Sequence, residues 1–154
     1  MNTSLLKLIK FAAPLSILAV PLYPFINGLG CNYTFVHDSP LNFQEGRCKA
    51  GILNVYIKNK ADGTVLLKKM RWGYAGDNLY TYHLDTIDVV QHLNRPKEYD
   101  SVTMLYRSME LEAGKIIRSK SNPQSYITLF EQPIEIVYEN RLKGRLGFVD
   151  AFRQ

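Results

Sequence analysis

Histidine and cysteine are scarce in this chain of 154 residues, which has three histidines and two cysteines. A structural zinc site needs four such ligands at short spacings, and a zinc-protease helix needs two histidines four positions apart. His37, His83 and His92 fit neither pattern. The sequence therefore predicts no metal site and no cofactor.

Nucleophile and phosphate-binding motifs are also missing. The chain has no Gly-x-Ser-x-Gly, and its Ser-x-x-Lys, at Ser4 and Lys7, falls in an apolar N-terminal segment unsuited to catalysis. The glycines of Gly73-Tyr74-Ala75-Gly76 favour a turn over a phosphate loop. We assign no catalytic or cofactor-binding residue, and we expect a binding protein more than an enzyme.

Charge of one sign is not concentrated anywhere in the sequence. Lysine and arginine number 19 against 14 aspartates and glutamates, and the basic residues are scattered instead of forming one run. This mild excess is typical of a solvated surface and gives no support to nucleic-acid binding.

A long hydrophobic run is lacking as well, although the N-terminus has a short one. Lys7 and Lys10 precede the apolar residues 11–20, and Gly28 and Gly30 follow. A positive end, a short apolar middle and small residues at the end are typical of a secretory signal, here cleaved after Gly30. The apolar run is shorter than the roughly 20 residues that cross a bilayer.

An uncleaved membrane anchor is the main alternative for residues 1–30, because Lys7 and Lys10 could snorkel to the headgroups and lengthen the span. A helix buried in a soluble fold is a further alternative. In the first two cases residues 31–154 form one domain outside the cytoplasm, periplasmic or secreted, and possibly anchored in the inner membrane.

Two cysteines, Cys31 and Cys48, then lie in an oxidising compartment, where such a pair usually forms a disulfide. Closing a loop of this length would stabilise the fold by about 3 kcal/mol. Two free thiols, or a lipid on Cys31 after cleavage, are the alternatives left open.

The clearest structural pattern lies between Gly51 and Trp72. Apolar and polar residues alternate at 53–58, Asp62-Gly63 provides a turn, and residues 65–72 form a second β-prone run. This pattern predicts a β-hairpin. On its returning strand Lys68, Met70 and Trp72 share the core face, and the intervening residues face water.

Strand-like runs recur along the rest of the chain. They lie at residues 32–36, 79–84, 102–107, 125–130, 134–138 and 146–149. A turn is expected at Glu112-Ala113-Gly114, and one short helix between Asp85 and Arg95. We predict a mainly β fold, an antiparallel sheet, sandwich or open barrel of about seven strands with one short helix, preceded by an N-terminal hydrophobic helix.

A binding surface is predicted where aromatic and basic residues interleave. Its residues are Lys69, Arg71, Tyr74, Tyr80 and Tyr82. Cationic and aromatic side chains together can bind a partner surface.

The sequence predicts a non-enzymatic binding or assembly component of a cell-envelope, secretion, pilus or virion structure. Its partner would be a protein of that assembly, with membrane contact through residues 1–30 if they are not cleaved. The alternatives are a small extracytoplasmic hydrolase or transferase, tested at His83 and Asp77, and an inhibitor or immunity protein that uses residues 119–124.

Overall fold

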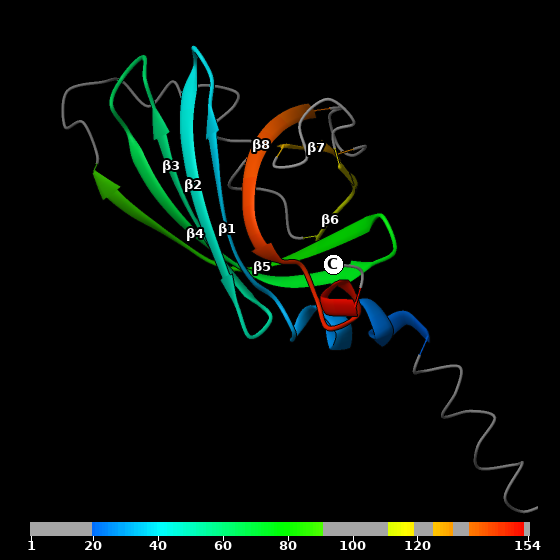
Figure 1. The fold of residues 1–154 in the computed structure, drawn as a ribbon. Coiled ribbons are helices and arrows are strands. Elements are labelled where there is room, and N and C mark those ends of the chain that lie inside the picture. The colour runs from blue at the N-terminus through cyan, green and yellow to red at the C-terminus, as the bar shows by residue number, and fades with distance from the viewer. Residues whose placement is uncertain (1–19, 91–110, 119–124, 131–135, 153–154) are drawn as a thin grey trace, which may run out of the picture.

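The structure, a computed structural model, describes residues 20–90, 111–118, 125–130 and 136–152 (Figure 1). Within these ranges eight antiparallel strands form a closed barrel, in which each strand pairs with the next and β8 pairs with β1. The strands are β1 (Asn32–Asp38), β2 (Asn42–Lys49), β3 (Ile52–Asn59), β4 (Val65–Ala75), β5 (Asn78–Val90), β6 (Leu111–Arg118), β7 (Ser125–Phe130) and β8 (Ile136–Arg145). A short 3-10 helix, η1 (Val149–Phe152), follows.

The two ends of the barrel differ. A helix at residues 20–28 and η1 lie together beneath the end where β8 finishes (Figure 1). We call this the helix end. The opposite end, where β1 turns into β2 and β3 into β4, is called the far end.

The predicted fold class is confirmed as a mainly β, antiparallel barrel with a short helical segment. The predicted hairpin is also confirmed, because β3 and β4 pair antiparallel. Gly63 takes the positive φ of 74° that the turn requires. β4 ends at Ala75, after which Gly76, with a φ of 63°, opens the next turn.

The prediction of a helix that begins at Asp85 is wrong for the residues that the structure describes. Residues 85–90 continue β5, and Ile87 lies opposite Leu67 of β4. Pairing with β4 satisfies the backbone groups on that edge of the segment, and this tertiary contact outweighs the local helical period. Residues 91–95 lie outside the described residues.

The turn expected at Glu112-Ala113-Gly114 is also wrong, because these residues belong to β6. Gly114 pairs with both Leu79 and Phe130, so the missing side chain does not interrupt the ladder. The whole of β2 was not predicted, since its glutamate, arginine and glycine conceal the alternation of Gln44, Gly46 and Cys48 toward the interior.

The remaining strand predictions have mixed outcomes. The runs at 32–36, 79–84 and 125–130 lie in β1, β5 and β7, whereas the run at 102–107 lies outside the described residues. The predicted strand at 134–138 begins, as described, at Ile136 in β8. The final strand predicted at 146–149 is wrong: the Asp150 carboxylate accepts a hydrogen bond from Leu146 N–H, and the chain bends into η1.

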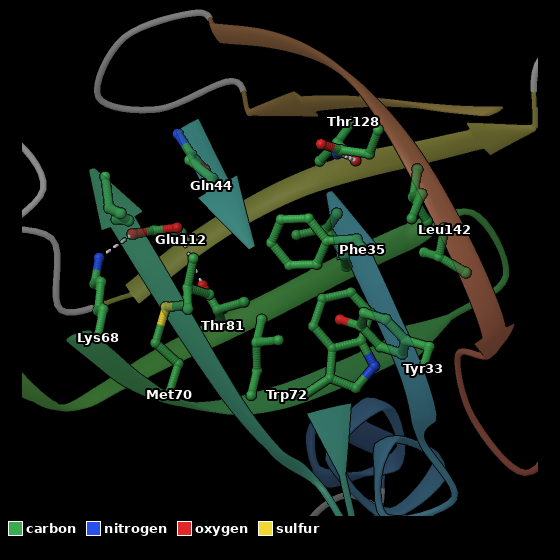
Figure 2. Close-up of a pocket in the computed structure, with 16 residues that line it drawn as sticks. Tyr33, Phe35, Gln44, Lys68, Met70, Trp72, Thr81, Glu112, Thr128 and Leu142 are labelled. Carbon is green, nitrogen blue, oxygen red and sulfur yellow. Dashed lines mark hydrogen bonds and ion pairs between the residues drawn. The ribbon is translucent and has the colours of Figure 1, made fainter. Parts of the chain in front are cut away.

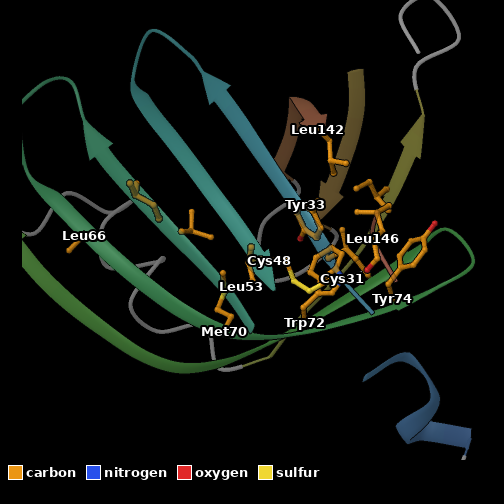
Figure 3. Packing of buried hydrophobic residues seen from close by; sticks show 14 residues of the cluster. Cys31, Tyr33, Cys48, Leu53, Leu66, Met70, Trp72, Tyr74, Leu142 and Leu146 are labelled. Atoms are coloured by element: carbon orange, nitrogen blue, oxygen red, sulfur yellow. Dashed lines mark hydrogen bonds between the residues drawn. A yellow bond between two sulfur atoms is a disulfide. The ribbon is translucent and has the colours of Figure 1, made fainter. Parts of the chain in front are cut away.

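The apolar core runs along the barrel interior from Leu66 near the far end to the aromatic rings at the helix end (Figure 3). Trp72 lies edge-on to Tyr33 with ring centroids 5.2 Å apart, and its indole Nε1–H donates to the Leu146 carbonyl at 2.8 Å. The strand alternation predicted for β4 is confirmed, since Lys68, Met70 and Trp72 are buried while Lys69 and Arg71 are exposed.

The predicted disulfide between Cys31 and Cys48 is present, with the two Cα atoms 5.8 Å apart. It joins the residue before β1 to the penultimate residue of β2, and both cysteines are buried in the same core. The bond therefore fastens the first two strands at the helix end.

Asn27 joins the helix to the barrel. Its side-chain amide donates to the Tyr74 carbonyl at 2.7 Å and accepts from Val149 N–H at 2.9 Å. Gly28 follows, and a Cβ atom there would come within 2.2 Å of the Trp72 carbonyl oxygen. The helix can approach the barrel this closely only because residue 28 has no side chain.

The helix that closes this end is short in its described part, residues 20–28. None of the helices in the described ranges has the length and apolarity needed to cross a membrane. The predicted boundary at residue 30 stays a prediction.

Candidate ligand-binding cavity

A cavity of about 90 Å³ runs through the barrel interior, and every strand contributes to its wall (Figure 2). Eight-stranded barrels are just wide enough either to be filled by side chains or to hold one small ligand. An engineered cavity of about 150 Å³ is large enough for benzene. The space here therefore suits a smaller or narrower molecule.

The cavity wall is apolar toward the helix end. Tyr33, Met70 and Trp72 form this part of the wall, together with Leu79 and Leu142. All five side chains are buried in the core. They offer a ligand mainly van der Waals contact, to which Tyr33 adds a phenolic hydroxyl.

A buried ion pair gives one side of the cavity its polarity. Lys68 Nζ lies 2.6 Å from Glu112 Oε1, with side chains 3% and 10% exposed. The Thr81 hydroxyl donates to the other carboxylate oxygen at 3.2 Å. Figure 2 shows the three side chains pointing toward one another from β4, β6 and β5. Two charges are thereby withdrawn from water but balanced.

Burying these two charges costs several kcal/mol each in desolvation, which their attraction offsets only in good geometry. A pair of apolar side chains would stabilise the barrel at least as well. Stability alone therefore does not account for the ion pair.

Asn140 provides a second polar group in the cavity wall. Its amide donates to the Thr128 hydroxyl at 3.0 Å. Its carbonyl oxygen is the one buried side-chain polar atom without a hydrogen-bond partner in the described part of the chain. Such an atom costs about 1–3 kcal/mol, so it favours a bound molecule that can donate a hydrogen bond.

The two halves of β5 are paired differently. β5 pairs with β6 from Asn78↔Lys115 to Tyr82↔Leu111, whereas its pairing with β4 continues to Val90. Within the described residues, Glu112 lies opposite Thr81 of β5, which lies opposite Trp72 of β4. The carboxylate of the ion pair therefore comes from the same row of the barrel as Trp72, and the ammonium comes from Lys68, four residues nearer the start of β4.

The predicted binding-surface residues do not all share a face. Lys69, Arg71 and Tyr82 are exposed on the outer wall, where Arg71 lies directly opposite Tyr82. Tyr80 is half-buried, and Tyr74 is buried with its ring stacked 6.5 Å from Trp72. All five residues therefore lie on β4 and β5, but Tyr74 is in the core whereas the other four are exposed or half-buried.

The residues considered for catalysis are separated. Asp77 is exposed in the turn before β5, whereas His83 is half-buried and lies 2.7 Å from the Thr86 hydroxyl. Six residues of extended chain span about 20 Å, so these two groups do not meet in one site. The described residues contain no cluster of ligands able to hold a metal ion.

Burial raises the pKa of the Tyr33 phenol well above its ordinary value of about 10. Desolvation is the cause, because the low-dielectric core disfavours the phenolate. The cavity wall beside Tyr33 therefore stays uncharged at physiological pH.

The chain matches no family model, and no curated protein resembles it detectably. The cavity is thus characterised by its own geometry.

The sequence contained a partial signal for this site. Lys68 falls on the core face of a predicted strand, where an unpartnered lysine is not tolerated. Its partner Glu112 was assigned to a turn, and Asn140 was not singled out. Both are brought to the cavity only by barrel closure.

Proposed function

We propose that the protein is a non-enzymatic binding protein whose barrel holds one small, uncharged amphipathic molecule. The observation that carries this proposal is the cavity itself, whose mostly apolar wall also contains the buried Lys68–Glu112 pair and the Asn140 amide. A ligand with an apolar body and one hydrogen-bond donor matches both kinds of lining.

The charge of the ligand follows from the ion pair. Lys68 and Glu112 already neutralise each other at 2.6 Å. A ligand with a net charge would therefore be buried without a counter-charge, which is costly. A hydroxyl group that donates to Asn140 Oδ1 has no such cost and would satisfy the oxygen that lacks a partner.

Trp72 makes this proposal testable without a label, because it is the only tryptophan of the chain and lines the cavity. Titration with 1-hexanol is expected to change its fluorescence saturably, with a dissociation constant on the order of a millimolar. Hexane and hexanoate should bind about tenfold more weakly, since hexane lacks the donor and hexanoate carries an uncompensated charge.

Two matched valine variants separate cavity binding from surface adsorption. Val55 lines the cavity, whereas Val36 is exposed on the outer wall of β1. Val55→Phe should abolish the saturable signal by filling the space, and Val36→Phe should leave it unchanged. Equal, non-saturating responses in both variants would reject the proposal, provided that both melt cooperatively.

Asn140→Leu tests the polar contact separately. This variant should bind hexane and hexanol equally, because the oxygen that prefers a donor has been removed. A persistent tenfold preference for hexanol would show that another group recognises the hydroxyl.

We further propose that the protein acts outside the cytoplasm. The Cys31–Cys48 disulfide is compatible with that location, since such bonds persist in oxidising compartments. A protein partner in an envelope or secreted assembly stays a prediction, which a pull-down from envelope extracts tests.

A further inference from the structure

The outer surface of the helix end is unusually apolar. A groove of about 480 Å³ lies between the helix segment and the barrel wall; among its lining residues are Leu22, Ile26, Leu29, Arg71, Tyr82 and Leu111. The leucine side chain of residue 111 is 62% exposed, and Val20, at the start of the described helix, is 74% exposed. The helix therefore presents apolar side chains to its surroundings as well as to the barrel.

These apolar residues continue a pattern in the sequence. Residues 11–20 are apolar and run directly into the described helix, while Lys7 and Lys10 precede them. Leu22, Ile26 and Leu29 are spaced to share one helical face. The described helix thus continues an apolar stretch of the sequence, and Val20, Leu22 and Ile26 remain exposed on it.

Basic side chains gather around the same end. Lys49 and Arg145 are the last residues of β2 and β8, and both lie beside Asn32 of β1. In the next row Arg47 and Lys143 lie on either side of Thr34. All four basic side chains are exposed. Barrel closure therefore assembles a basic patch from residues that are scattered in the sequence.

Acidic residues on the same wall lie toward the other end. Glu45 and Glu139 occupy the far-end portions of β2 and β8, and Asp38 ends β1. At the helix end, Asp77 is exposed and Asp150 accepts a hydrogen bond from Leu146 N–H. The wall formed by β8, β1 and β2 is therefore basic at the helix end, whereas charges of both signs are mixed toward the far end, where Glu45 and Arg141 flank Val36 and Asp38 pairs with Lys60.

We propose that the helix end docks on an anionic lipid bilayer. The exposed apolar side chains of residues 20–29 and Leu111 would lie in the interface, and the basic patch would face lipid phosphates. Shallow apolar burial combined with several basic residues is the usual basis of binding to anionic membranes. This inference concerns the outer wall and does not depend on the cavity.

The test uses the full chain mixed with vesicles of phosphatidylcholine and phosphatidylglycerol. An environment-sensitive dye is attached to an encoded azido side chain at Leu29, at Leu111 or, as a control, at Leu41. Leu41 is 71% exposed between β1 and β2 at the far end. Dyes at residues 29 and 111 should shift to the blue and be quenched by spin-labelled lipids, whereas the dye at residue 41 should remain aqueous.

A charge reversal then tests the basic patch. Lys49→Glu/Arg145→Glu should lower the apparent lipid affinity, measured from quenching of the dye at residue 111, by more than about tenfold. The reason is that the charge reversal turns attraction to the lipid phosphates into repulsion. The matched pair Lys58→Glu/Lys60→Glu, at the far end of β3 and in the turn that follows it, changes the same charge and should have little effect.

Three results would overturn the proposal. The dyes at residues 29 and 111 could remain as aqueous as the dye at residue 41, or both charge-reversed pairs could behave alike. Light scattering could also show that a second copy covers the groove before lipid is added. The cavity-filling variant Val55→Phe should leave quenching unchanged, so failure here is distinguishable from failure of ligand binding.

Discussion

The helix end and the cavity wall differ in the interactions that they contain. At the helix end a disulfide, packed aromatic rings and the Asn27 hydrogen bonds hold the strands in one arrangement. The cavity wall contains an ion pair and an amide oxygen without a partner. Packing and backbone contacts therefore dominate at the helix end, whereas in the cavity wall buried polar groups lie among apolar side chains such as Val55 and Ile57.

This difference indicates where a ligand would enter. The helix and η1 close the helix end with short backbone hydrogen bonds, such as Phe148 N–H to the Asn27 carbonyl at 3.0 Å. A ligand entering there would have to break them. Entry elsewhere along the barrel would leave these hydrogen bonds in place.

The largest expected effect on stability comes from breaking the buried Lys68–Glu112 ion pair. Lys68→Met should lower the free energy of unfolding by about 3–5 kcal/mol, because Glu112 is left buried without its counter-charge. Urea denaturation measures this loss. Adding Glu112→Leu should restore the full stability or exceed it, because both charges are then gone. A double variant as unstable as the single one would mean that the pair is a structural necessity.

Breaking the helix end at the disulfide should have a slightly smaller effect. Cys31→Ala/Cys48→Ala should cost about 3 kcal/mol, because the unfolded chain regains the freedom that the 17-residue separation had restricted. Thermal unfolding with and without reductant gives the same comparison in the unaltered chain. Identical melting in both conditions would contradict this account of the helix end.

Asn27→Ala should cost about 2 kcal/mol, because the Tyr74 carbonyl and the Val149 N–H both lose their partner. The far-end counterpart is Ser39, whose hydroxyl contacts Asn42 in an exposed turn. Ser39→Ala should cost less than about 1 kcal/mol, since water replaces the lost contacts. Equal losses of unfolding free energy in Asn27→Ala and Ser39→Ala would contradict the proposed difference between the two ends.

The pH dependence gives the smallest and most local effect. Burial raises the pKa of folded Tyr33, so its contribution to stability is complete below pH 10. That contribution should decline as the pH rises from the unfolded-state pKa toward the folded-state pKa. Tyr33→Phe should flatten the decline in denaturation curves collected on either side of pH 10. A decline of unchanged slope would assign it to other groups.

The fold was predictable where the sequence pattern is local. Alternation in β3 and β4 gave both the hairpin and the side of the sheet that Lys68, Met70 and Trp72 face. The disulfide followed from the expected oxidising compartment. These features depend on neighbouring residues or on composition, and both are visible without the structure.

The unpredicted parts depend on distant partners. Glu112 resembles a turn residue beside Ala113 and Gly114, and only Lys68, 44 residues away, explains why it belongs in a strand. Gly46 in β2 leaves room for the Phe35 ring, which a Cβ atom would meet at 2.0 Å. The cavity and the basic patch likewise exist only once β8 pairs with β1.

Native mass spectrometry of the full-length protein, purified without added alcohols and then mixed with 1-hexanol, is the most direct test of the binding cavity. We expect one hexanol molecule per chain, retained by Val36→Phe and absent from Val55→Phe. Several molecules bound without saturation, or one molecule bound equally by both variants, would contradict a binding site inside the barrel.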